Sequence, residues 1–137
     1  MKRILIACLL ALMLSGARAQ TSQPRAVAET FLTTIAQGKT AVAYDKLFEG
    51  SNISKDKGAG ASIKKQTDAA LPPFGKVLGF ELIREEPIGA SLVRLVYLLK
   101  SERHLTSWEF YFYKPKTNWF VAEINFTDRF YLLNAKK

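Results

Sequence analysis

The stretch that decides the fold is "TSWEFYFYKPKTNWFVAEINF", residues 106–126, which carries eight aromatic side chains, two of them tryptophan. On both sides of the central "PKTN" the apolar residues alternate along the chain, and this is the period of a β-strand. Proline and asparagine in the short interruption predict a turn, so the stretch forms a hairpin of two strands. Its rings either line a binding cavity or fill a core, and the sequence leaves both interpretations open.

The two-residue period begins upstream of this hairpin. It predicts four strands joined by short turns, at residues 75–86, 92–100, 104–114 and 119–128. Across the strands the outward faces carry charge, and Arg94 is expected to pair with a glutamate on a neighbouring strand. The residues predicted to face inward are Leu78, Phe80, Leu82, Val93, Leu95, Tyr97, Leu99, Thr106, Trp108, Phe110, Phe112, Phe120, Ala122, Ile124 and Phe126.

Helical spacing dominates the part of the chain that precedes the strands. It predicts helices at residues 24–39, 40–50 and 62–71, with a loop at 51–61 between the second and the third. Thr40 is expected to cap the second helix. Three N-terminal helices followed by four strands predict an α+β domain, with the helices packed on the concave face of a curved, mainly antiparallel four-stranded sheet.

The N-terminal residues 1–19 have the three parts of a secretory signal: a basic start, an apolar run at residues 4–14 and a small-x-small cleavage site at 17–19. The apolar run is too short to span a bilayer as a helix, which needs about 20 residues. We therefore expect an exported protein, periplasmic in a bacterium or secreted. Residues 20–137 are expected to form a single domain with no membrane span.

Composition excludes several classes of function. The single cysteine, Cys8, lies in the predicted signal, and His104 is the single histidine, so neither a zinc site nor a disulfide is expected. The net charge is +8, but the basic residues are scattered rather than gathered on one element, so a nucleic-acid partner is not expected. His104 opens a strand and is interpreted as an exposed edge residue. No metal, cofactor or catalytic residue is predicted.

The order of elements resembles that of the nuclear transport factor 2-like superfamily over residues 24–128. The resemblance rests on "AETFLTTIAQGKTAVAYDKL", residues 28–47, and "WEFYFYKPKTNWFVAEINF", residues 108–126. It implies the cone-shaped fold of ketosteroid isomerase and the SnoaL-like cyclases, with a pocket between the concave sheet and the helices. Catalytic relatives place an aspartate or histidine in that pocket, and many members pair through the convex face of the sheet.

Two sets of residues follow as candidates for contact with a ligand or a partner. The first could line the pocket, although filling the core is the favoured interpretation: Tyr44, Phe48, Phe80, Tyr97, Thr106, Trp108, Phe110 and Phe112. The second lies on the opposite face of the last hairpin and could form a homodimer interface: Tyr111, Tyr113, Trp119 and Val121.

Because the predicted inward faces carry no acid, base or histidine, the first hypothesis is an exported, non-catalytic binding or accessory domain. It would hold a small apolar ligand or a protein partner. An alternative is an isomerase- or cyclase-type enzyme that uses Glu109 or Glu123, since a bulge or a one-residue slip would turn either glutamate inward. A third hypothesis is a structural subunit of an envelope assembly.

Overall fold

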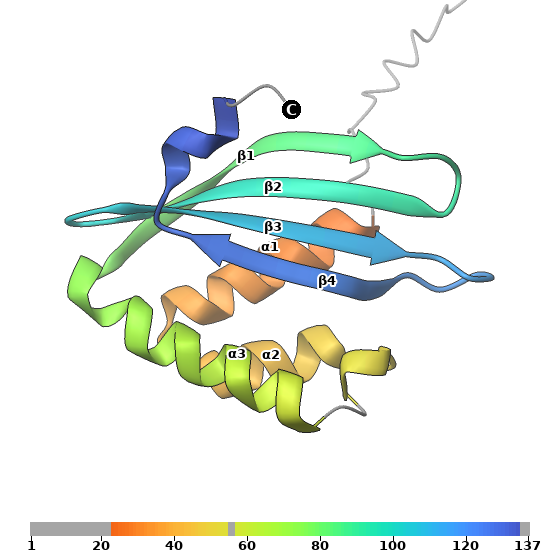
Figure 1. Ribbon diagram of the computed structural model, residues 1–137, viewed down its shortest axis with the longest axis horizontal. Helices are drawn as coiled ribbons and strands as arrows, with labels where there is room; N and C mark the ends of the chain where they lie inside the picture. Colours follow the sequence, from red (N-terminus) through yellow and green to blue (C-terminus); the bar gives the residue numbers. More distant parts are fainter. Residues whose placement is uncertain (1–22, 55–56, 135–137) are drawn as a thin grey trace, which may run out of the picture.

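The computed structural model describes residues 23–54 and 57–134, and it has the predicted α+β class. Four antiparallel strands form one curved sheet in the order β1-β2-β3-β4, and three helices cover one of its faces (Figure 1). The predicted signal, residues 1–19, lies outside the described residues. Within the described ranges no helix is both long and apolar enough to cross a membrane.

The helices are α1 (Gln23–Ala36), α2 (Thr40–Phe48) and α3 (Lys57–Ala70). Helix α3 begins earlier than expected, and a short 3-10 helix, η1 (Asn52–Ser54), occupies part of the predicted loop. Glycines suggested a loop there, but Gly60 is helical, and a Cβ added to it would lie 3.7 Å from the Phe48 ring. This glycine therefore brings α3 close to α2 rather than ending a helix.

The strands are β1 (Val77–Pro87), β2 (Leu92–Ser101), β3 (Leu105–Tyr113) and β4 (Phe120–Thr127). The central strands β2 and β3 pair without a register shift, and their faces alternate as predicted. The inward faces of β2 and β3 carry large side chains that are completely buried: Leu95, Tyr97, Leu99, Trp108 and Phe110.

Register shifts in the two edge strands overturn some of the predicted faces. In β1 a shift between Val77 and Gly79 leaves Leu78 66% exposed instead of inward. In β4, Val121 pairs with Phe112 while Glu123 pairs with Tyr111, so Ala122 is the extra residue of a bulge. As a result Val121 is buried in the core and Ala122 is exposed, and both predicted faces were wrong.

A C-terminal 3-10 helix, η3 (Phe130–Asn134), was not predicted. It lies on the face of the sheet opposite the helices (Figure 1). Arg84 Nη2 donates to the carbonyl oxygen of Leu133 at 2.9 Å, which ties η3 to β1. His104 is half-buried rather than exposed, because its ring contacts Phe130, with centroids 5.7 Å apart.

Candidate functional site

The space between the sheet and the helices is filled by aromatic rings. Phe31 of α1 lies at the centre, with its ring centroid 4.9 Å from that of Tyr44 and 5.6 Å from those of Trp108 and Phe110. Trp108 also stacks on Phe126 at 4.7 Å. These edge-to-face and stacked pairs are favourable arrangements for aromatic rings, so the cone interior is a packed core where the rings meet.

Polar atoms among these rings find partners inside the chain. Trp108 Nε1 donates to Thr106 Oγ1 at 2.9 Å. The Thr67 hydroxyl donates to the carbonyl oxygen of Ile63 at 2.9 Å, so the Tyr44 hydroxyl, 2.7 Å away, is the donor to Thr67. Burial raises the pKa of Tyr44 above its usual range, because the phenolate would lose its hydration.

The eight pocket candidates belong to this packing. Seven are buried at 4% exposure or less, and Phe80 is partly buried against the core. Thr106 also lines a groove of about 570 Å³ between α3 and the neighbouring ends of β3 and β4. The arrangement favours the core interpretation over a ligand cavity lined by all eight residues.

One charged cluster at the edge of the core was missed. The Tyr97 hydroxyl donates to Glu29 Oε1 at 3.3 Å, and Arg25 Nε donates to the same oxygen at 2.9 Å. Glu85 Oε2 lies 4.0 Å from Arg25 Nη1. The shift between Leu82 and Arg84 changes the face of β1 and pairs Glu85 with the inward-facing Leu95.

The spacing of Arg25 and Glu29, four residues apart on a helix, was the sequence signal for that ion pair. Burial, and then the charge of Glu29, raise the pKa of Tyr97. The Glu29 side chain remains about 32% exposed and is paired with arginine. Glu29 is therefore an ion-paired carboxylate at the edge of the core, and not an unpaired base inside it.

The two glutamates of the enzyme alternative lie on the convex face. Arg94 Nε donates to Glu109 and its Nη1 donates to Glu86 at 2.8 Å, which confirms the expected cross-strand pairing. The Tyr111 hydroxyl donates to Glu109 Oε1 at 2.7 Å, and this bond raises the pKa of Tyr111. Glu123 is exposed and accepts a bond from a neighbouring asparagine. The bulge in β4 turns neither carboxylate inward.

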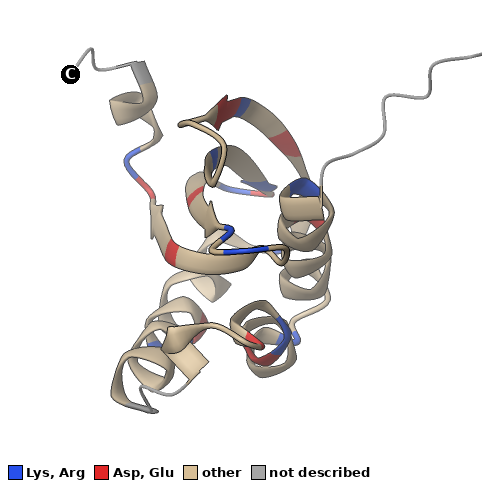
Figure 2. Ribbon diagram, turned by 90° about the vertical axis from the view of Figure 1, so that its right-hand side faces the viewer, with Lys and Arg blue, Asp and Glu red and all other residues tan. Residues whose placement is uncertain are grey.

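The dimer candidates divide between surface and core. Tyr113 is 47% exposed, and Trp119 is half-buried with Lys114 Nζ 4.9 Å from its ring centroid. Tyr111 is half-buried, whereas Val121 is in the core and is no longer available to a partner. Charged residues are scattered over the sheet and the helices rather than gathered on one side (Figure 2).

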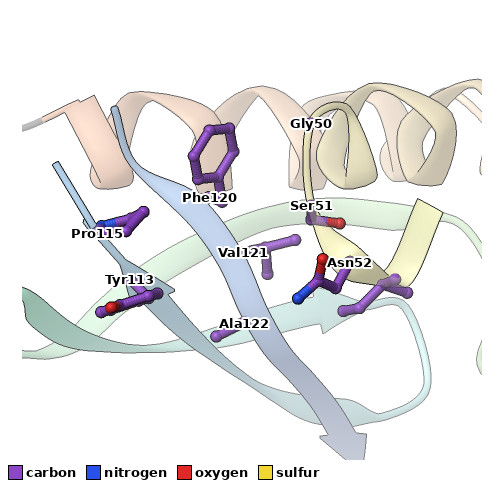
Figure 3. Close-up of a pocket in the computed structure, with 9 residues that line it drawn as sticks. Gly50, Ser51, Asn52, Tyr113, Pro115, Phe120, Val121 and Ala122 are labelled. Carbon is purple, nitrogen blue, oxygen red and sulfur yellow. The ribbon is translucent and has the colours of Figure 1, made fainter. Parts of the chain in front are cut away.

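Two grooves flank the edge strand β4. The first, of about 400 Å³, lies where β4 begins and is lined by residues 50–53, Tyr113, Pro115 and 120–122. Figure 3 shows its β4 residues across from the loop that carries Gly50, Ser51 and Asn52. The second is the groove of about 570 Å³ at the opposite end of β4, beside α3. Both have mostly apolar walls and can accept apolar side chains.

In residues 23–54 and 57–134 no three His, Cys, Asp or Glu side chains lie close enough together to hold a metal ion.

Comparison with known proteins supports the fold. No family model matches the chain, and no curated protein matches it. A solved structure from Campylobacter jejuni, described as an NTF2-like (nuclear transport factor 2-like) transpeptidase, is 17% identical, with a TM-score of 0.54. The match covers 73% of this chain and 97% of the other. This similarity supports an NTF2-like α+β fold.

Proposed function

We propose that the chain is an exported, non-catalytic binding domain that takes up an extended segment of a partner protein along β4. The observation that carries this proposal is the open edge of β4, with an apolar groove at each of its two ends. An edge strand presents unpaired backbone N–H and C=O groups to which another strand can add. The two grooves would take apolar side chains of the added segment.

The packed interior supports a scaffold role. The largest side chains of the cone, among them Tyr44, Tyr97 and Trp108, are completely buried. Recognition through β4 needs no space inside the cone. The packed core can therefore stabilise the domain while a separate, surface strand binds the partner.

The two edges of the sheet differ in how well they are protected against strand addition. Strand β1 has two register shifts, ends at Pro87 and carries four charged residues, at 81 and 84–86. Strand β4 has one shift and carries one charged residue, Glu123. Bulges, charges and prolines are devices that block pairing at an edge, so β4 is the edge suited to a partner.

Site-specific photo-crosslinking in the native host tests this proposal. A photoreactive amino acid placed at Ala122 or Asn125, both exposed on β4, should give a covalent adduct with the partner. The same group at Ile83, which is exposed at the bulge of the opposite edge, is the matched control. Mass spectrometry should place the cross-link in an extended partner segment with alternating apolar side chains.

Equal adducts from both edges, or adducts only from Ile83, would refute recognition through β4. An adduct of twice the chain mass would identify the partner as a second copy. Substrate turnover that is lost on Glu29→Gln substitution without loss of the fold would refute the non-catalytic part. For export, N-terminal sequencing of protein from the host envelope should begin at Gln20, and an intact Met1 would contradict it.

The exposed aromatic Tyr113 favours a second candidate, a homodimer through the convex side of the last hairpin. Sedimentation velocity of the wild type and of Tyr113→Ser would separate the two. Loss of a dimer on this substitution would support the convex interface. A monomer at all concentrations would remove it.

A further inference from the structure

A pocket of about 270 Å³ lies at the end of the molecule where α1 and α3 finish and β1 begins (Figure 1). This pocket shares no lining residue with either of the two grooves beside β4. Ile35, Leu71 and Val77 give it an apolar wall, and Thr40 lines it at the start of α2. This volume is just below the range for pockets that hold drug-sized ligands, about 300–1,000 Å³, and suits a smaller molecule.

The start of α2 brings positive potential to this pocket. Lys39 is the N-cap residue and makes no side-chain capping bond, so Thr40 is the first helical residue and not the predicted cap. The Ala43 N–H donates to the Lys39 carbonyl, but the N–H groups of residues 40–42 have no acceptor in the described part of the chain. Free N–H groups at a helix start, together with the helix dipole, attract an anionic group.

The Thr40 hydroxyl is a second sign of a ligand. Thr40 is 8% exposed and makes no hydrogen bond within the described residues. Within the described residues, every side-chain nitrogen or oxygen that is inaccessible to solvent has a hydrogen-bond partner. The Thr40 hydroxyl oxygen has none, so it must be accessible to solvent. Thr40 lines the pocket, so its hydroxyl, which has no partner among the described residues, is available to hydrogen-bond a polar group that enters the pocket.

The pocket also carries one charge of each sign. Lys76 and Asp68 both line it. Neither side chain takes part in an ion pair among the described residues. A purely anionic ligand would be repelled by Asp68, and a purely cationic one by Lys76 and the helix start. A ligand with both charges is complementary to both.

We propose that this pocket binds a small zwitterion, an α-amino acid with an apolar side chain. Its carboxylate accepts hydrogen bonds from the start of α2 and from Thr40, near the ammonium of Lys76. Its own ammonium group pairs with Asp68. Its side chain lies against the wall formed by Ile35 and Leu71. This site is independent of partner binding at β4.

The floor of the pocket is held in place before any ligand arrives. The backbone N–H of Lys76 donates to Glu102 Oε2 at 3.1 Å. Arg103 Nε donates to the carbonyl oxygen of Pro73 at 3.1 Å. The backbone N–H of Arg103 donates to the carbonyl oxygen of Phe74 at 2.9 Å. These bonds tie the start of β1 to the β2–β3 turn, so little ordering is needed on binding.

Titration of the 15N-labelled protein with L-leucine, followed by NMR, tests the site. The amides of Gly38, Ala41 and Gly75 should shift and saturate with a dissociation constant of order millimolar. N-acetyl-L-leucine lacks the ammonium and L-leucinamide lacks the carboxylate. Each should bind at least about tenfold more weakly, because one charge-assisted contact is lost.

Substitutions separate the two ends of the ligand. Asp68→Asn should abolish the preference for leucine over N-acetyl-leucine and keep the preference over leucinamide. Thr40→Val should weaken leucine binding severalfold, whereas the matched Thr40→Ser keeps the hydroxyl and the affinity. The proposal is overturned if leucine gives no saturable shift, if the three compounds bind alike, or if Asp68→Asn leaves the discrimination unchanged.

Discussion

The buried bond between Trp108 and Thr106 allows a sharp prediction about stability. Trp108 is completely buried and Thr106 is 1% exposed. The indole N–H donates to the threonine hydroxyl at 2.9 Å. Thr106→Val keeps the shape of the side chain and removes the acceptor, so the N–H remains buried without a partner.

The cost follows from the burial of both groups. A buried donor without an acceptor loses about 1–3 kcal/mol, and replacing a hydroxyl by a methyl group recovers little of this at constant volume. The free energy of unfolding of Thr106→Val should therefore fall by about 1–3 kcal/mol. For a domain of this size each 1 kcal/mol corresponds to roughly 3–6 °C in Tm.

Urea unfolding followed by circular dichroism measures this change. Thr106→Ser keeps the acceptor and removes one methyl group, so it should lose less than Thr106→Val. Trp108→Phe removes the donor, and the two substitutions combined should cost less than their sum, because the valine then strands no N–H. A loss below about 0.5 kcal/mol for Thr106→Val would show that the bond is not needed to satisfy the indole.

Three further predictions concern the loop, the convex face and the tyrosines. Gly50 and Gly38 both have φ +73°, but an added Cβ would lie 2.7 Å from the Phe120 ring at Gly50 and would meet nothing within 4 Å at Gly38. Gly38→Ala should therefore lower the free energy of unfolding, measured in urea, by about 1–2 kcal/mol. Gly50→Ala should lower it by at least about 1 kcal/mol more, and an equal loss for the two variants would show that the Phe120 ring moves aside freely. Arg94→Met should lower the free energy of unfolding by about 1–2 kcal/mol, and by less in 1 M salt, whereas the exposed Lys100→Met should change it by less than about 0.5 kcal/mol. Raised pKa values keep tyrosines neutral in the fold, so their contribution to stability is complete below the unfolded pKa of about 10 and is lost as the pH rises towards the folded values. The urea midpoint should fall above about pH 10, and an absorbance titration of the folded protein should show late ionisation of Tyr44, Tyr97 and Tyr111. Unshifted titration of these three tyrosines would contradict this.

The α+β class and the faces of the central elements could be read from the sequence. Phe31 and Leu32 lie on one face of α1 at helical spacing and are buried, and alternation along the strands identified Tyr97 and Trp108. These predictions were correct because the side that an element buries follows from its own period, provided that its pairing is regular. Strands β2 and β3 meet that condition.

Tertiary structure alone decided the rest. Whether Val121 lies inside, Leu78 outside or Glu85 beside α1 depends on where a strand bulges against its neighbour, and one extra residue inverts every face beyond it. The grooves beside β4 and the pocket at Thr40 join segments that are far apart in the chain. Local periodicity predicts which face of a helix or strand is buried. A site forms only where segments that are distant in the sequence come together in the folded chain, and periodicity does not specify those contacts.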